Sequence, residues 1–70
     1  METTFSIVVN GENRSAKPGL TVVDLLRELG LDSGRVAIER NREILSRPKW
    51  AETAVEPQDN YEIVQFVGGG

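Results

Sequence analysis

Apolar and polar residues alternate along the first part of the chain in a way that predicts two paired strands. Phe5, Ile7 and Val9 recur at every second position, which places them on one buried face of a strand. The Asn10-Gly11 pair that follows is the strongest short signal for a hairpin turn, because both residues tolerate a positive φ. We therefore expect residues 14–17 to return as a short, polar edge strand.

The next segment has the spacing of a short amphipathic helix. Thr21 and Asp24 are three residues apart, as in a capping box, so the helix should begin at Thr21. The apolar positions that follow form one stripe at helical spacing: Val22, Leu25, Leu26 and Leu29. Gly30 stands where a glycine commonly ends a helix. A helix of about nine residues is not stable alone, so we expect this stripe to pack on a sheet.

The second half of the chain predicts three further strands. Residues 36–38 and 44–45 have the composition of a second hairpin. Pro48 lacks an amide donor, so an irregular or 3₁₀ connection should follow, with Trp50 filling the core beneath it. Residues 61–67 are apolar on both faces, which is typical of a central strand.

The order strand, strand, helix, strand, strand, strand predicts an α+β fold. We expect a mixed sheet of four to five strands, with one main helix packed across one face. The first and last strands should lie side by side and parallel, because the helix supplies the crossover that a parallel pair requires.

The last strand is expected to present a different apolar pair on each face. Tyr61 and Ile63 share one face, which should pack beneath the helix. Val64 and Phe66 share the other face and should be exposed beside the C-terminal end, where we expect them to bind a partner. The alternative is that Phe66 closes the bottom of the core, which a bulge near the chain end would allow.

Composition excludes several classes of function. The 70 residues include no Cys and no His, so the chain has no thiol nucleophile, no sulfur ligand for a metal and no side chain with an ordinary pKa near neutrality. We therefore expect neither side-chain catalysis nor a metal site. Eleven acidic and eight basic residues give a net charge of −3, and the basic residues are interleaved with acidic ones. No surface for nucleic acid is expected from this pattern.

The sequence also shows no membrane or export signal. No apolar run approaches the roughly 20 residues that span a bilayer. Residues 1–4 lack the basic start and apolar core of a signal peptide. We therefore expect a cytoplasmic protein with one domain over residues 1–67 and a flexible tail over residues 68–70.

The tail is the candidate functional segment. Gly68, Gly69 and Gly70 directly follow the last apolar strand. A glycine run binds phosphate where a helix N-terminus comes next, and none follows here. Without Cβ atoms, such a tail can lie extended in a channel too narrow for side chains and present its terminal carboxylate inside another protein. The alternative is a frayed end, since chain termini are often disordered.

The chain resembles the ThiS family of sulfur carrier proteins, which are ubiquitin-like β-grasp domains of bacterial thiamine biosynthesis. The likeness covers essentially the whole chain and is most specific in the last strand with its glycines. It is carried by residues 10–11, 21–26, 36–41, Trp50 and 62–70. One departure lies in the turn before the last strand, where family members often have Gly-Asp and this chain has Gln58-Asp59.

The resemblance implies a group carrier and not an enzyme. A ThiF-like adenylyltransferase would adenylate the carboxylate of Gly70, using its own ATP and Mg²⁺. A persulfide donor, such as a cysteine desulfurase, would then supply the sulfur that leaves a terminal thiocarboxylate. A ThiG-like thiazole synthase would use this sulfur for the thiazole ring of thiamine. The chain itself would bind no cofactor, no nucleic acid and no membrane.

Three other functions stay open at this point. The same chemistry at Gly70 would suit a sulfur carrier for molybdopterin synthesis, cysteine synthesis or tRNA thiolation. A protein modifier would instead join its C-terminal carboxyl to a lysine. The third is a binding module with an idle tail.

Overall fold

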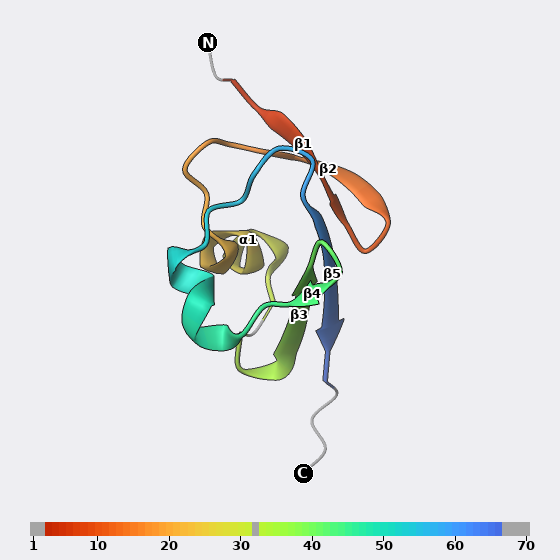
Figure 1. Ribbon diagram of the computed structural model, residues 1–70, viewed down its shortest axis with the longest axis vertical. Coiled ribbons are helices and arrows are strands. Elements are labelled where there is room, and N and C mark those ends of the chain that lie inside the picture. The colour runs from red at the N-terminus through yellow and green to blue at the C-terminus, as the bar shows by residue number, and fades with distance from the viewer. Residues whose placement is uncertain (1–2, 32, 67–70) are drawn as a thin grey trace.

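The computed structural model describes residues 3–31 and 33–66. The strands are β1 (Phe5–Val9), β2 (Glu12–Ala16), β3 (Val36–Arg40), β4 (Glu43–Ile44) and β5 (Asn60–Gln65). The helices are α1 (Val22–Leu29) and the 3₁₀ turns η1 (Ser33–Arg35) and η2 (Arg47–Glu52). The sheet has the order β2-β1-β5-β3-β4, in which only the β1–β5 pair is parallel. Figure 1 shows α1 and η2 on one side of this sheet. The predicted α+β architecture, with β5 in the centre and β1 beside it, is confirmed.

Both hairpins have tight turns of two residues with positive φ. These are Asn10-Gly11, at 51° and 82°, and Asn41-Arg42, at 52° and 71°. Turns of this kind match the twist of the strands, so pairing starts immediately on either side. β2 therefore begins at Glu12 and not at residue 14, and β4 begins at Glu43 and not at residue 44.

The helix begins and ends as its sequence predicts. Thr21 Oγ1 accepts a hydrogen bond from the Asp24 amide at 3.2 Å, and Asp24 Oδ2 accepts one from the Thr21 amide at 3.0 Å. This is the reciprocal capping box, with Asp in place of the usual Glu. Gly30 ends the helix in the left-handed conformation, at a φ of 72°.

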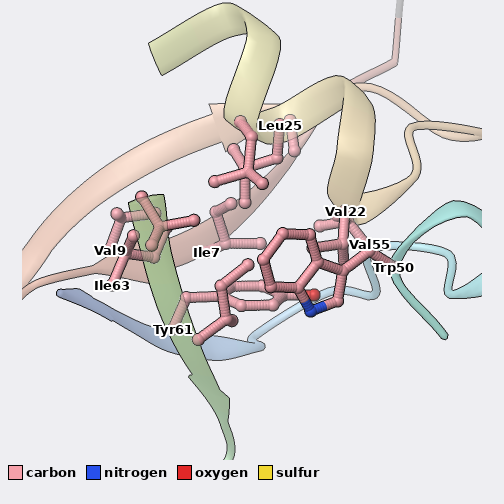
Figure 2. Packing of buried hydrophobic residues seen from close by; sticks show 12 residues of the cluster. Ile7, Val9, Val22, Leu25, Trp50, Val55, Tyr61 and Ile63 are labelled. Carbon is pink, nitrogen blue, oxygen red and sulfur yellow. The ribbon is translucent and has the colours of Figure 1, made fainter. Parts of the chain in front are cut away.

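The core lies between α1 and the face of the sheet that α1 covers. Figure 2 shows Val22 and Leu25 of the helix above Ile7 of β1 and Tyr61 of β5. Tyr61 is fully buried, as the alternation in the last strand predicts. The other buried apolar residues are Val9, Ala16, Leu26, Val36, Ile38, Trp50, Val55 and Ile63.

Trp50 closes the core beneath η2, as predicted for this connection. Its side chain is 3% exposed and lies beside Val55 and Val22 in Figure 2. The indole Nε1–H donates to the Leu45 carbonyl at 2.8 Å, so the one polar atom of the buried ring is satisfied. Trp50 is therefore a packing residue and not a ligand platform.

The last strand is shorter than the sequence suggests. β5 spans Asn60–Gln65, whereas residues 61–67 were the predicted strand. The Phe66 amide still donates to the Arg35 carbonyl at 2.7 Å, although the paired residues of β3 and β5 end at Val36 and Gln65. The last residue of the predicted strand, Val67, lies outside the described residues.

Candidate functional site

The candidate site is built on β5, whose backbone is hydrogen-bonded on both sides. Toward β3, the Phe66 amide bonds the Arg35 carbonyl at 2.7 Å. Toward β1, the Tyr61 carbonyl accepts from the Asn10 amide at 2.9 Å. Since bonding to both neighbours leaves a strand little freedom to slide, β5 has a single register with respect to the rest of the sheet.

The side chain of Asn10 continues the hydrogen bonding between β1 and β5 beyond the last residue of β1. The chain turns away at Asn10, yet the Asn10 carboxamide reaches the backbone of Ile63 on β5. Its Oδ1 accepts from the Ile63 amide at 2.8 Å, and its Nδ2 donates to the Ile63 carbonyl at 3.2 Å. The carboxamide thus takes the place of the next residue of β1 and holds β5 three residues before Phe66.

The start of β5 is held by a buried carboxylate. Asp59 is 5% exposed. Its Oδ2 accepts from Arg40 Nε at 3.0 Å, from the Tyr61 hydroxyl at 2.8 Å and from the Glu56 amide at 2.9 Å. Its Oδ1 accepts from Asn41 Nδ2 at 3.1 Å. Asp59 therefore ties the turn before β5 to the β3–β4 hairpin.

These contacts set the charge state of the Asp59 cluster. Burial alone would raise the pKa of the Asp59 carboxyl, but its hydrogen bonds outweigh the burial and hold the pKa below its usual value. Burial, with the neighbouring carboxylate, raises the pKa of Tyr61 above its usual value. Asp59 is thus ionised and Tyr61 neutral at neutral pH. We call this cluster the Asp59 lock. Its role is structural, because the Asp59 carboxylate is hydrogen-bonded to the side chains of Arg40, Asn41 and Tyr61.

The turn before β5 keeps a left-handed residue although glycine is missing there. Gln58 has a φ of 67°, and its amide donates to the Ser6 carbonyl at 2.8 Å. The departure from the family pattern at Gln58-Asp59 therefore leaves the turn in a conformation that glycine favours. An L-residue pays about 1 kcal/mol or more for this conformation.

The exposed pair predicted for the last strand is confirmed. Val64 is 59% exposed and Phe66 is 55% exposed, whereas Tyr61 and Ile63 are buried beneath the helix. Phe66 therefore does not close the bottom of the core. We call the side of the sheet that faces away from α1 the open face.

Ile44 is a surface residue that the sequence patterns did not reveal. It is 84% exposed on β4 and lines, with Val64, a hollow of about 170 Å³ on the open face. The strand Glu43–Ile44 is too short for an alternating pattern to assign its faces. The sequence indicates the exposure of Ile44 only weakly, by placing a large apolar residue directly after the polar residues 41–43.

The predicted tail lies outside the described residues, as does Val67. The predictions for Gly68, Gly69 and Gly70 therefore stay predictions. In residues 3–31 and 33–66, no group of three acidic side chains is placed to hold a metal ion. Within the same residues, no helix combines the length and the apolar character needed to cross a membrane.

The fold has relatives of known family. The sequence model of the ThiS family matches residues 7–70. A crystal structure of the thiamine biosynthesis protein ThiS from Geobacter metallireducens superposes with a TM-score of 0.78 at 33% identity, over 94% of this chain and 100% of that chain. The sulfur carrier protein ThiS of Bacillus subtilis is 42% identical over 50 residues, which are 71% of this chain and 76% of that protein.

A thiazole synthase contains a segment that is similar to this chain. The enzyme of Paramagnetospirillum magneticum is 50% identical over 66 residues, which are 94% of this chain but only 20% of that protein. The chain thus spans about a fifth of the length of this relative. The match over residues 7–70, the shared β-grasp sheet and the similarity to carriers of comparable length agree with one another, and the chain is a member of the ThiS family of sulfur carrier proteins.

Proposed function

We propose that the chain carries sulfur to thiazole synthesis in the thiamine pathway, as a thiocarboxylate on Gly70. A ThiF-like adenylyltransferase activates the Gly70 carboxylate with ATP and Mg²⁺. A persulfide donor, such as a cysteine desulfurase, supplies the sulfur, and a thiazole synthase receives it. Gly68 and Gly69 form the slim tail that enters both active sites. The chain is a co-substrate of these enzymes and performs no catalysis of its own.

The chemistry explains why activation is needed. A carboxylate is a poor electrophile, so one of its oxygens first attacks the α-phosphorus of ATP and pyrophosphate leaves. The terminal sulfur of a persulfide then attacks the acyl carbon and AMP leaves, which gives an acyl disulfide. A thiol then attacks the sulfur that is not bonded to the acyl carbon and forms a new disulfide with it, which breaks the S–S bond of the acyl disulfide. The thiocarboxylate that remains is a good sulfur nucleophile.

The position of β5 is the observation that carries this proposal. β5 is the central strand, locked at its start by Asp59 and near its end by Asn10. It leads to the glycines through Phe66, and four residues separate Phe66 from the end of Gly70. Four extended residues reach about 14 Å at most. An enzyme that acts on the Gly70 carboxylate must therefore dock within about 14 Å of Phe66.

The similarity to a thiazole synthase supports the choice of acceptor. In Paramagnetospirillum magneticum, a segment that is 50% identical to this chain is part of a protein with that name. A carrier and the enzyme that consumes its sulfur gain from such a linkage, because a tethered partner is present at a high effective concentration.

Intact-protein mass spectrometry tests the proposal. The purified chain is incubated with a ThiF-like enzyme, ATP, Mg²⁺, a cysteine desulfurase, cysteine and a thiol. We expect the mass to rise by the difference between one sulfur and one oxygen, and we expect no change without ATP or after deletion of Gly70. An unchanged mass with a competent enzyme would refute the carrier function. Higher-mass conjugates on lysines would instead identify a protein modifier.

A further inference from the structure

The open face of the sheet carries an apolar surface that nothing in the described chain covers. Among residues 3–31 and 33–66, the large apolar side chains that are mostly exposed are Ile44, Val64 and Phe66. The helix α1 and the 3₁₀ turn η2 lie on the other side, as Figure 1 shows. Side chains of this kind are normally withdrawn from water, so their gathering on one face marks an interaction surface.

The strand register makes this surface continuous across three strands. Val64 of β5 lies opposite Ala37 of β3, and Ile44 of β4 lies opposite Glu39 of β3. Ile44, Ala37 and Val64 line one hollow of about 170 Å³. Phe66 follows two positions after Val64, so it extends the same face toward the C-terminal end. In protein interfaces a few central side chains contribute most of the binding free energy, so three large apolar side chains are enough to form such a centre.

An acidic pair lies inside this apolar surface. Glu39 and Glu62 are directly opposite each other on β3 and β5, and both are exposed. Neither makes an ion pair within the described part of the chain. Like charges directly opposite on a sheet are destabilising. A cationic side chain placed between the two carboxylates would relieve this repulsion and would be flanked by Ile44 and Val64, which line the same hollow.

We infer that this open face is the docking surface for the thiazole synthase, which binds it through a basic side chain set among apolar groups. The inference rests on the proposed function and adds Ile44, Glu39 and Glu62 to the predicted contacts Val64 and Phe66. The thiazole synthase is the occupant because a similar segment is part of such an enzyme in Paramagnetospirillum magneticum. The short reach of the tail requires the enzyme to dock close to Phe66.

Calorimetric binding to the thiazole synthase of the same organism tests the inference with three variants. Ile44→Asp places a charge on the apolar surface, and Glu62→Gln removes one carboxylate without changing its shape. Ala51→Asp is the matched control, because it places the same charge on an exposed position of η2, on the other side of the sheet. Thermal unfolding of each variant confirms that it is folded before its affinity is compared.

We expect Ile44→Asp to weaken binding about tenfold or more. Glu62→Gln should weaken it about threefold to tenfold and make the affinity less sensitive to salt. Ala51→Asp should bind like the unchanged chain. If folded Ile44→Asp and Glu62→Gln keep full affinity, or if they impair only the ThiF-like enzyme, the inference is wrong.

The mass assay separates this failure from failure of the proposed function. An unchanged chain that gains sulfur and binds the thiazole synthase, while the open-face variants bind equally well, overturns only the docking surface. An unchanged chain that gains no sulfur overturns the carrier function itself. An unchanged chain that gains sulfur but does not bind the thiazole synthase overturns both the proposed acceptor and its docking surface.

Discussion

The carboxamide of Asn10 hydrogen-bonds both backbone groups of Ile63, at 2.8 Å and 3.2 Å, across 53 positions of sequence. It does so from the first position of a tight turn, at a φ of 51°. Asparagine suits this place for two reasons, because it tolerates positive φ and because its amide can mimic a peptide group. One side chain thus closes the hairpin turn and pins the strand that leads to the tail.

Asn10→Gly isolates the clamp, since glycine fits the turn but has no carboxamide. The Ile63 amide and carbonyl would lose their partners, so we expect the free energy of unfolding to fall by about 1–3 kcal/mol. Hydrogen exchange at the Ile63 amide should accelerate more than exchange elsewhere in β5. Arg42→Gly is the control, at a φ of 71° in the other hairpin turn, and it should be neutral or stabilising. Equal exchange at Ile63 in both variants would contradict the clamp.

The Asp59 lock predicts an acid-sensitive fold. Because the pKa of Asp59 is lower in the folded chain than in the unfolded chain, its contribution is fully present above the usual value of 3.8. It is lost as the pH falls through the folded-state pKa. Asp59→Asn should therefore lower the free energy of unfolding at pH 7 by about 2 kcal/mol and flatten its dependence on pH below about 5.

Denaturant unfolding at a series of pH values measures the effect of Asp59. Glu56→Gln is the control, because it removes a nearby carboxylate whose side chain is exposed. We expect this variant to keep the acid sensitivity of the unchanged chain. An Asp59→Asn profile parallel to that of the unchanged chain would show that other carboxylates cause the acid sensitivity.

The turn at Gln58 offers a stabilising substitution. Gln58 is exposed and has a φ of 67°, so Gln58→Gly removes backbone strain without removing a buried contact. We expect the free energy of unfolding to rise by about 0.5–1 kcal/mol, after the extra flexibility of unfolded glycine is counted. Glu56→Gly, at a residue without positive φ, should instead destabilise the chain. A lower melting temperature for Gln58→Gly would show that the turn is not strained.

Phe66→Ala separates a binding role from a packing role. Phe66 is 55% exposed, so truncation should change the melting temperature little. If Phe66 is an anchor for the activating enzyme or the thiazole synthase, truncation should cost about 2 kcal/mol or more of binding free energy. Thermal unfolding and affinity are measured on the same preparation. A large loss of stability with full affinity among the folded molecules would refute the binding role.

The tail is predicted to work by slimness. Gly69→Val introduces a β-branched side chain into a segment that we expect to enter a narrow channel. The buried core described for this chain lies between Ile7 and Ile63, so we expect the melting temperature to stay the same, while adenylation by the ThiF-like enzyme should be abolished. Pyrophosphate release measures this step. A normal rate of thiocarboxylate formation on Gly69→Val would disprove the narrow channel.

Much of this fold follows from patterns between residues close in sequence. Alternation in β1 and β5 predicts which side chains meet the helix, and Tyr61, Ile63, Val64 and Phe66 all lie on their predicted faces. The capping box at Thr21 predicts the start of α1. Such patterns succeed because a strand or a helix turns its residues at a fixed period. Strand ends were less predictable, because β2 and β4 begin earlier than expected where a two-residue turn lets pairing start at once.

The sequence by itself determined the α+β architecture, the faces of the central strand and the glycine run that follows it. Only the tertiary structure decided the bond from Asn10 to Ile63, the burial of Asp59 with Arg40 and the place of Ile44 beside Val64. The first two contacts join residues that are 53 and 19 positions apart, and the third joins two strands that are not neighbours. The local period of the chain carries no information about such contacts, which arise only when the whole sheet assembles.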